Sequence, residues 1–339
     1  MGPKALTRLT GAGCALALLA ACGAHDPRAA FVDAQPPPAL AERFYPPEGW
    51  AWGLISVGGG PAQRYGVAAP AVVSKGQVLI LPDYGETAET WFETARDLGA
   101  VGYTVWILEG VGQGGSERLA SPRDLGELRS FAVDRIAVRA MAETVIRPDA
   151  DHPLVILGQG VGAYVAARAV ETGARPSGLI LSGASCDRPV VGGLLRDLGF
   201  GALRAPGESG WRRDGADDFA RKRTHDVWRG AVTHAWQVAN PDLRMGGPSL
   251  DWQAAFAELQ GRTLDDLDRL DAPTAILDAD RATPCLGVPG ADRRRFPGAR
   301  PALELEDNAH RGPWLAAVID TLARMTKAAR SAHGVDHGP

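Results

Sequence analysis

A glycine-rich turn between an apolar segment and an alanine-rich segment constrains this chain more than any other feature. The stretch 153–171 reads PLVILGQGVGAYVAARAVE. Residues 154–157 form a short apolar run typical of a buried strand, and the apolar residues after Gly162 recur at helical spacing. Gly158, Gly160 and Gly162 permit a sharp turn between the two elements. Taken alone, the stretch fits a simple packing turn, so any functional meaning depends on its surroundings.

Strand and helix patterns alternate along most of the chain. This alternation predicts an α/β fold with a mostly parallel, doubly wound sheet. The predicted strands are a first hairpin of 50–57 and 62–67, then 77–81, 103–108, 154–157, 178–182, 274–277 and 301–305. The predicted helices are 89–98, 125–146, the one after Gly162, and a closing helix at 313–325.

Composition shifts divide the chain into segments with different expected roles. A long segment rich in Trp, Arg and Asp interrupts the strand–helix rhythm, which predicts a helical cap inserted into the core. The expected segments are a signal peptide at 1–21, a Pro-rich tether at 22–48, a core at 49–186, the cap at 187–270, the rest of the core at 271–328 and a disordered tail at 329–339.

The N-terminus has the pattern of a secretory signal. Lys4 and Arg8 precede an apolar run that is too short to span a bilayer. The run ends in L-A-A-C, which resembles a bacterial lipobox and implies cleavage before Cys22 and acylation of its thiol. Gly23 after this cysteine fits sorting to the outer membrane, so the expected location is the cell envelope, facing the periplasm and attached to the membrane by the lipid. An ordinary signal peptide or a short anchor remains the alternative.

Charge and side-chain spacing argue against several other classes of protein. The formal net charge is −4, and the chain lacks a basic block, so nucleic acid is not an expected partner. The seven histidines have no zinc-site spacing, and the four cysteines form no C-x-x-C motif. The sequence therefore predicts neither a metal site nor a cofactor.

Three motifs in order around the glycine turn give the chain a family resemblance. Residues 82–86 read P-D-Y-G-E where the family reads H-G-x-G-E, and Glu109 to Ser116 fits D-x-x-G-x-G-x-S apart from Glu for Asp. Pro241 to Trp252 fits P-x-L-x-x-G-G-P-S-x-x-W. Over residues 50–325 the chain resembles the lysophospholipase and monoacylglycerol-lipase branch of the α/β-hydrolases, which is related to the serine aminopeptidase S33 group. The resemblance implies a serine hydrolase with a Ser-Asp-His triad.

The resemblance places the triad on residues that mostly cannot form one. Gly160 stands at the nucleophile, in the centre of G-x-S-x-G. Asp280 takes the acid position in D-A-D-R, with Asp278 or a solvated loop carboxylate as alternatives. The closing segment F-P-G-A-R-P-A-L keeps the family register and puts Pro301 at the base. His310 is a less favoured base, because reaching it requires a loop extension that the register of Glu306 and Arg311 opposes.

These departures remove the same chemistry, since neither glycine nor proline has a side chain that can transfer a proton. The resemblance still implies oxyanion-type backbone donors at Tyr84 and Val161, although Asp83 beside them opposes anion binding. Gln159 and Trp252 are the expected ligand-binding side chains. An apolar pocket above Gly160 is expected under the cap.

The sequence therefore predicts a lysophospholipase-like protein with a disabled triad that binds a monoacyl lipid or a protein partner. One alternative is a working carboxyl-ester hydrolase that uses an unrecognised nucleophile, with Ser182, Ser185 and Cys186 as the candidates, or His310 as base. Another is a structural partner protein whose old pocket is filled.

Two cysteines are candidates for a disulfide. Cys186 and Cys285 remain once Cys14 is removed with the signal and Cys22 is acylated. Both follow strands that are expected to be neighbours at the same edge of the sheet, in an oxidising compartment. A disulfide between them is one outcome, and two buried free thiols are the other.

Overall fold

The computed structural model describes residues 28–186, 193–214, 222–280, 285–332 and 334. Eight strands form one sheet in the order β1-β2-β4-β3-β5-β6-β7-β8. The pairs β1–β2 and β2–β4 are antiparallel, and the remaining pairs are parallel, as the alternating pattern predicts. The strands are β1 (Ala51–Ile55), β2 (Gln63–Ala68), β3 (Gln77–Leu81), β4 (Thr104–Leu108), β5 (Leu154–Gln159), β6 (Gly178–Ser182), β7 (Thr274–Asp278) and β8 (Asp292–Arg295).

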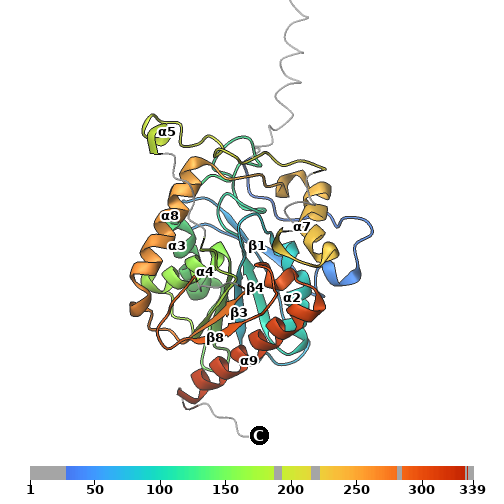
Figure 1. Cartoon of the computed structure of the whole chain (residues 1–339). Coiled ribbons are helices and arrows are strands. Elements are labelled where there is room, and N and C mark those ends of the chain that lie inside the picture. The colour runs from blue at the N-terminus through green and yellow to red at the C-terminus, as the bar shows by residue number, and fades with distance from the viewer. Residues whose placement is uncertain (1–27, 187–192, 215–221, 281–284, 333, 335–339) are drawn as a thin grey trace, which may run out of the picture.

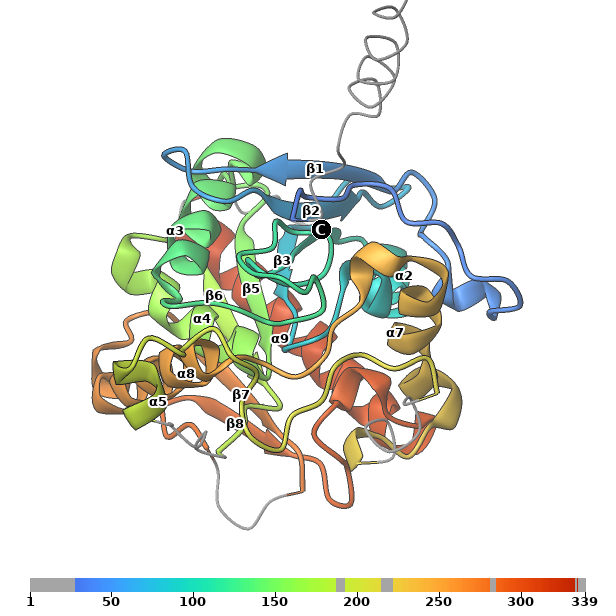
Figure 2. The same ribbon diagram turned by 90° about the horizontal axis from the view of Figure 1, so that it is seen from above.

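Helices cover both faces of the sheet (Figures 1 and 2). They are α2 (Phe92–Ala100), α3 (Ala132–Ala140), α4 (Val161–Ala169), α5 (Gly193–Asp197), α7 (Val227–Ala239), α8 (Leu250–Asp265) and α9 (Asn308–Ala332). Successive strand residues point to opposite faces. Val78 and Ile80 of β3 join one apolar cluster with Trp314 of α9, whereas Leu79 joins a second cluster with Tyr164 of α4. The sheet is therefore buried on both sides. No helix in the described residues is both long and apolar enough to cross a membrane.

The cap lies over the carboxyl ends of the parallel strands and is built mainly from α5, α7 and α8 (Figure 2). It docks on the core through the motif at 241–252. The hydroxyl of Tyr84 donates a hydrogen bond to the carbonyl of Gly246 (2.8 Å), and the Tyr84 ring packs against Trp252 with the ring centres 4.5 Å apart. Ser249 caps α8 by accepting the Trp252 N–H at 3.0 Å. The motif thus fixes the cap to the core.

Two predicted elements differ from the structure for tertiary reasons. The helix expected from residue 125 begins only at Ala132, because residues before it pair with the cap: Gly126 bridges Pro248, and its carbonyl accepts the Ser249 N–H. The last strand is β8, not 301–305, where a 3-10 turn (η7, Leu303–Leu305) stands instead. Proline at 301 has no N–H for a strand ladder, and the arginine-rich β8 lacks the apolar pattern that reveals a strand.

Residues 28–48 and 329–332 are more ordered than composition predicts. Residues 28–48 of the expected tether lie against the domain: Phe31 N–H donates to Gly115, and Phe44 is buried beside Trp236 of α7. The expected disordered tail is helical up to Ala332, where α9 ends. The signal peptide and Cys22 lie outside the described residues.

Candidate active site with an occupied oxyanion hole

The glycine turn forms the sharp elbow that the sequence predicts. Gly160 links β5 to α4 with φ +54° and ψ −114°, a conformation that side-chain-bearing residues rarely adopt. The flanking glycines allow close backbone approach, because a Cβ on Gly162 would stand 2.0 Å from the carbonyl oxygen of Leu81. The turn therefore has the shape of a nucleophile elbow, with no side chain at its centre.

The carboxylate of Asp83 fills the space beside Gly160. Its Oδ1 accepts the backbone N–H groups of Tyr84 and Val161, each at 2.8 Å. The resemblance assigns these two N–H groups to the oxyanion hole, and in the structure both donate to Oδ1 of Asp83. A Cβ on Gly160 would lie 2.1 Å from Cγ of Asp83. The carboxylate thus occupies the region where a nucleophile's side chain and the developing oxyanion of a substrate would meet.

Arg223 of the cap holds this carboxylate from above. Its Nη2 lies 2.8 Å from Oδ2 of Asp83 and 2.9 Å from Oε1 of Glu86. Glu86 also accepts the N–H of Asp83 at 3.1 Å and the indole N–H of Trp91 at 3.0 Å. The ion pairs tie the cap to the elbow. The sequence gives no motif around Arg223 that could have predicted this role.

A second buried carboxyl group lies behind the first. Glu304 of η7 is 2% exposed and lies beside Glu86. Burial, and then the neighbouring Glu86 carboxylate, raise the pKa of Glu304 well above its ordinary value. Burial raises the pKa of Glu86 as well, whereas the Arg223 guanidinium lowers it. The cluster carries two carboxylates and one guanidinium in place of a triad.

The base and acid positions do not form a catalytic pair. The Pro301 carbonyl accepts the side-chain amide of Gln159 at 2.9 Å, which places Pro301 next to the end of β5. The Asp280 carboxylate binds Arg295 at 2.5 Å and the N–H of Gly298 at 2.9 Å. Neither partner is an imidazole. The hydrogen bond from Gly298 and then the one from Arg295 hold the pKa of Asp280 below its usual range. The alternative acid, Asp278, is 3.9 Å from Arg293.

His310 lies at the start of α9, and its side chain contacts residues away from the Gly160 elbow. Its Nδ1 is 2.7 Å from Oδ1 of Asp307, and its ring stacks on that of His225. Its partners are therefore Asp307, the residue just before α9, and His225 of the cap segment. This geometry gives His310 no part in a triad with Gly160.

Two of the three alternative nucleophiles, Ser182 and Cys186, are engaged elsewhere. The Ser182 hydroxyl is fully buried and accepts the indole N–H of Trp314 at 3.0 Å. Cys186 forms a disulfide with Cys285, with Cα atoms 4.9 Å apart. The Ser185 carbonyl accepts the hydroxyl of Tyr164 at 2.6 Å. Ser182 and Cys186 therefore cannot attack a substrate in this arrangement.

The two expected ligand-binding side chains serve packing. Gln159 is fully buried and holds Pro301, while Trp252 is 4% exposed and packs against Phe131 and Phe256. A cavity bordered by Asp83 and Val161 has a volume of about 30 Å³, room for one or two water molecules. Ligand pockets usually hold about 300–1,000 Å³. All its lining residues belong to the core, so it is a different place from the apolar pocket expected between the cap and Gly160, which stays a prediction.

Glu109, from the second family motif, has a structural role. Its carboxylate accepts the N–H of Ala88 and the N–H of Gly115, each at 2.7 Å, and pairs with Arg64. Both side chains of that ion pair are fully buried. A buried charge that is paired and hydrogen-bonded on every side orders the loops around it. This motif therefore shapes the loops beside the elbow.

Comparison with known families and structures agrees with this geometry. A family model described as "Serine aminopeptidase, S33" matches residues 73–284. No curated protein matches the chain significantly.

Solved structures of lipases and esterases share the fold at low sequence identity. A monoglyceride lipase variant from Saccharomyces cerevisiae is 17% identical, with a TM-score of 0.62, over 86% of this chain and 99% of that one. A carboxyl esterase from Bacillus coagulans is 15% identical, with a TM-score of 0.63, over 82% and 99%. A monoacylglycerol lipase from Paleococcus ferrophilus is 15% identical, with a TM-score of 0.57, over 76% and 98%.

Proposed function

The chain belongs to the serine aminopeptidase S33 family of α/β-hydrolases, and we propose that this lipase-like member acts by binding instead of hydrolysis, as a lipid-anchored protein of the bacterial cell envelope. The observation that carries the proposal is the Asp83 carboxylate in the oxyanion hole. It receives both backbone donors and is paired with Arg223 of the cap.

Hydrolysis fails in this site for three independent reasons. Gly160 offers no nucleophile, and Pro301 offers no base. Losing either group costs on the order of 10⁵–10⁶ in turnover in a serine hydrolase. The backbone N–H groups that would stabilise a substrate oxyanion are already bound to Oδ1 of Asp83. A substrate carbonyl would have to displace Asp83 and separate it from Arg223.

The binding surface is then the outside of the cap, and its occupant is a protein partner. The Asp83 carboxylate fills the space beside Gly160, which argues against a monoacyl lipid bound there. The cap exposes apolar side chains over a short stretch, and such patches mark contact surfaces on soluble domains. The exposed apolar residues of this stretch are Leu194, Leu195, Leu198, Phe200 and Leu203.

The proposed lipid anchor would keep this face near a membrane. The N–H of Arg118 donates to the carbonyl of Arg28 at 2.8 Å, which fixes the chain to the domain from residue 28. The Arg123 guanidinium binds the carbonyls of both Ala29 and Asp242, so this attachment lies beside the cap. Six residues span at most about 20 Å. An acylated Cys22 would therefore hold the domain close to the lipid surface, which supports a role in the envelope.

The enzymatic half of the proposal is tested with purified soluble protein. We expect no labelling by a fluorophosphonate probe and no hydrolysis of short-chain or monoacyl esters, with an active serine esterase as positive control. Stoichiometric labelling of a serine, or turnover that the probe abolishes, would contradict the loss of hydrolysis.

The binding half is tested on the full-length protein by cross-linking in intact cells. We expect one cross-linked protein partner that is lost when Leu198 and Phe200 are replaced with glutamate. Val73→Glu is the control, because Val73 is even more exposed than Leu198 and Phe200 but precedes β3, at the opposite end of the sheet from the cap. Equal loss in the control would contradict the cap surface. A stoichiometric lipid that co-purifies with the soluble domain would favour the lipid-binding alternative.

A further inference from the structure

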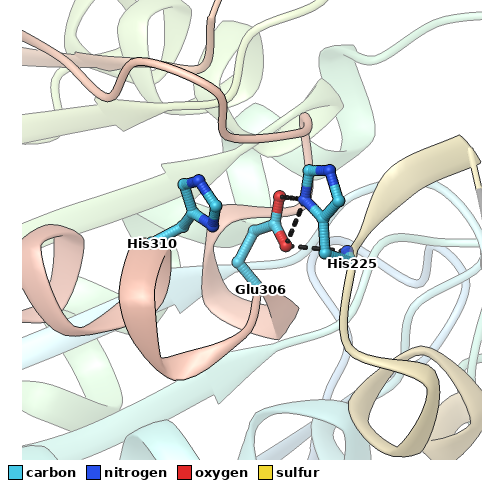
Figure 3. A group of neighbouring side chains, drawn as sticks. All are labelled: His225, Glu306 and His310. Atoms are coloured by element: carbon cyan, nitrogen blue, oxygen red, sulfur yellow. Dashed lines mark hydrogen bonds and ion pairs between the residues drawn. The ribbon is translucent and has the colours of Figure 1, made fainter.

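Two histidines and a glutamate from distant parts of the chain meet at the junction of cap and core (Figure 3). His225 lies in the cap segment just before α7, Glu306 follows η7, and His310 lies in the first turn of α9. One ligand-type atom from each residue lies within 4.8 Å of the other two. The His225 and His310 rings are stacked, with their centres 5.2 Å apart.

We propose that His225, Glu306 and His310 bind a divalent transition-metal ion, with Zn²⁺ as the ion that the ligand set fits best. Two imidazoles and one carboxylate are a ligand set found in zinc sites that keep a fourth position for water. Glu306 is fully buried, while the two rings are partly exposed, so an ion could enter from the solvent side of the imidazoles.

Backbone N–H groups hold the Glu306 carboxyl group in place. Its oxygens accept the backbone N–H groups of Arg300 (2.5 Å) and His225 (2.8 Å). These hydrogen bonds fix the orientation of the carboxyl group, and Oε1 lies 2.9 Å from Nδ1 of His225.

His310 carries the supporting contact that metal-binding histidines usually have. Its Nδ1 is 2.7 Å from Oδ1 of Asp307. In metal sites, the second ring nitrogen of a ligating histidine is commonly bound to a carboxylate, which orients the ring and raises its basicity. Asp307 thereby leaves Nε2 of His310 for the ion, and it acts as a positioning residue.

Without metal, the same residues form a plain hydrogen-bonded contact. Nδ1 of His225 is 2.9 Å and 3.1 Å from the two oxygens of Glu306. An ion would replace this contact and tie the cap segment to α9. Because Arg223 lies two residues before His225, the metal would also steady the guanidinium that holds Asp83. The inference is independent of the loss of hydrolysis.

The test is titration of tag-free soluble protein, stripped with chelator, with Zn²⁺ in competition with a chromophoric chelator. We expect one equivalent to bind and the melting temperature to rise by about 4 °C at a hundredfold excess over Kd. His225→Ala and His310→Ala should each weaken binding at least tenfold and remove the thermal shift. Asp307→Asn should weaken it about 10–100-fold.

The control variant is His234→Ala, which removes a histidine that contacts the Arg213 carbonyl and lies outside the cluster. It should bind Zn²⁺ as the unchanged protein does. Binding of less than a fifth of an equivalent by the unchanged protein overturns the proposal, and so does binding that survives in the His225→Ala/His310→Ala double variant. The histidine variants carry the test even if changes at buried Glu306 prevent folding.

Discussion

Replacing Gly160 with alanine should destabilise the protein far more than an ordinary glycine-to-alanine change at positive φ. The new methyl group would lie 2.1 Å from Cγ of Asp83, whereas carbon atoms in contact are normally about 3.5–4.0 Å apart. The carboxylate must therefore leave the oxyanion hole. Its departure breaks two hydrogen bonds from backbone N–H groups and the ion pair with Arg223.

The expected magnitude follows from these contacts. A hydrogen bond to a charged group contributes about 1.5–3 kcal/mol, and the side chain of Asp83 is only 22% exposed. Losing two such bonds destabilises by about 3–6 kcal/mol, and the strained backbone at Gly160 adds about 1–3 kcal/mol for any residue with a Cβ. We expect Gly160→Ala to lower the free energy of unfolding by at least about 4 kcal/mol.

A double-mutant cycle with Asp83→Gly isolates the clash. In that background the space beside residue 160 is empty, so Gly160→Ala should cost only the backbone strain, about 1–3 kcal/mol. Gly58→Ala is the matched control, because Gly58 has φ +61° and nothing within 4 Å of its added Cβ. Urea unfolding followed by circular dichroism gives each free energy. If Gly160→Ala costs the same with and without Asp83, the carboxylate does not occupy the oxyanion hole and the account of the site is wrong.

Three further predictions test other parts of the structure. Arg223→Met should destabilise by about 3–5 kcal/mol at pH 7, because it leaves the buried Glu86 carboxylate without its cation. Urea unfolding at pH 5 should show a smaller loss, because burial raises the pKa of Glu86 and protonation then removes its charge. Burial raises the pKa of Asp134 from 3.8 to about 7, so its contribution to stability is complete below pH 4 and is lost as the pH rises through 7. The unchanged protein should therefore lose free energy of unfolding relative to Asp134→Asn, by roughly 1.4 kcal/mol per pH unit from pH 5 to pH 7. Urea unfolding of both proteins from pH 5 to 8 measures this difference, and a difference that stays constant would contradict the prediction. Replacing Cys186 and Cys285 with serine should lower the free energy of unfolding by about 2–4 kcal/mol, and intact mass with and without reductant should differ by two protons in the unchanged protein only.

Local spacing along the sequence determined most of the fold. The strand–turn–helix of β5, Gly160 and α4 follows from residues that are neighbours in the chain, where apolar period and glycine set the backbone directly. The same holds for β3 and β6, whose bounds match the predicted strands. The elements that differ are those shaped by other parts of the chain. Gly126 pairs with the cap, and β8 is an edge strand of alternately exposed charged residues with no apolar period.

The sequence also identified what the active site lacks, but not what replaces it. The absence of a serine at 160 and of a histidine at 301 can be read directly from the aligned motifs. The position of the Asp83 side chain in the oxyanion hole could not be predicted from the sequence, because its partners Val161 and Arg223 lie 78 and 140 residues away in the chain. The sequence indicated only that a carboxylate near those donors would oppose anion binding. The tertiary structure makes that carboxylate the bound anion.

The cluster of His225, Glu306 and His310 shows the same limit. His225 is separated from Glu306 by 81 residues, a distance at which no spacing rule for metal ligands applies, so the sequence predicted no metal site. Short-range patterns encode backbone conformation because neighbouring residues share dihedral and periodic constraints. Contacts between side chains of the cap and the core form only when the sheet brings distant segments to its carboxyl edge, and this juxtaposition decides the chemistry of the site.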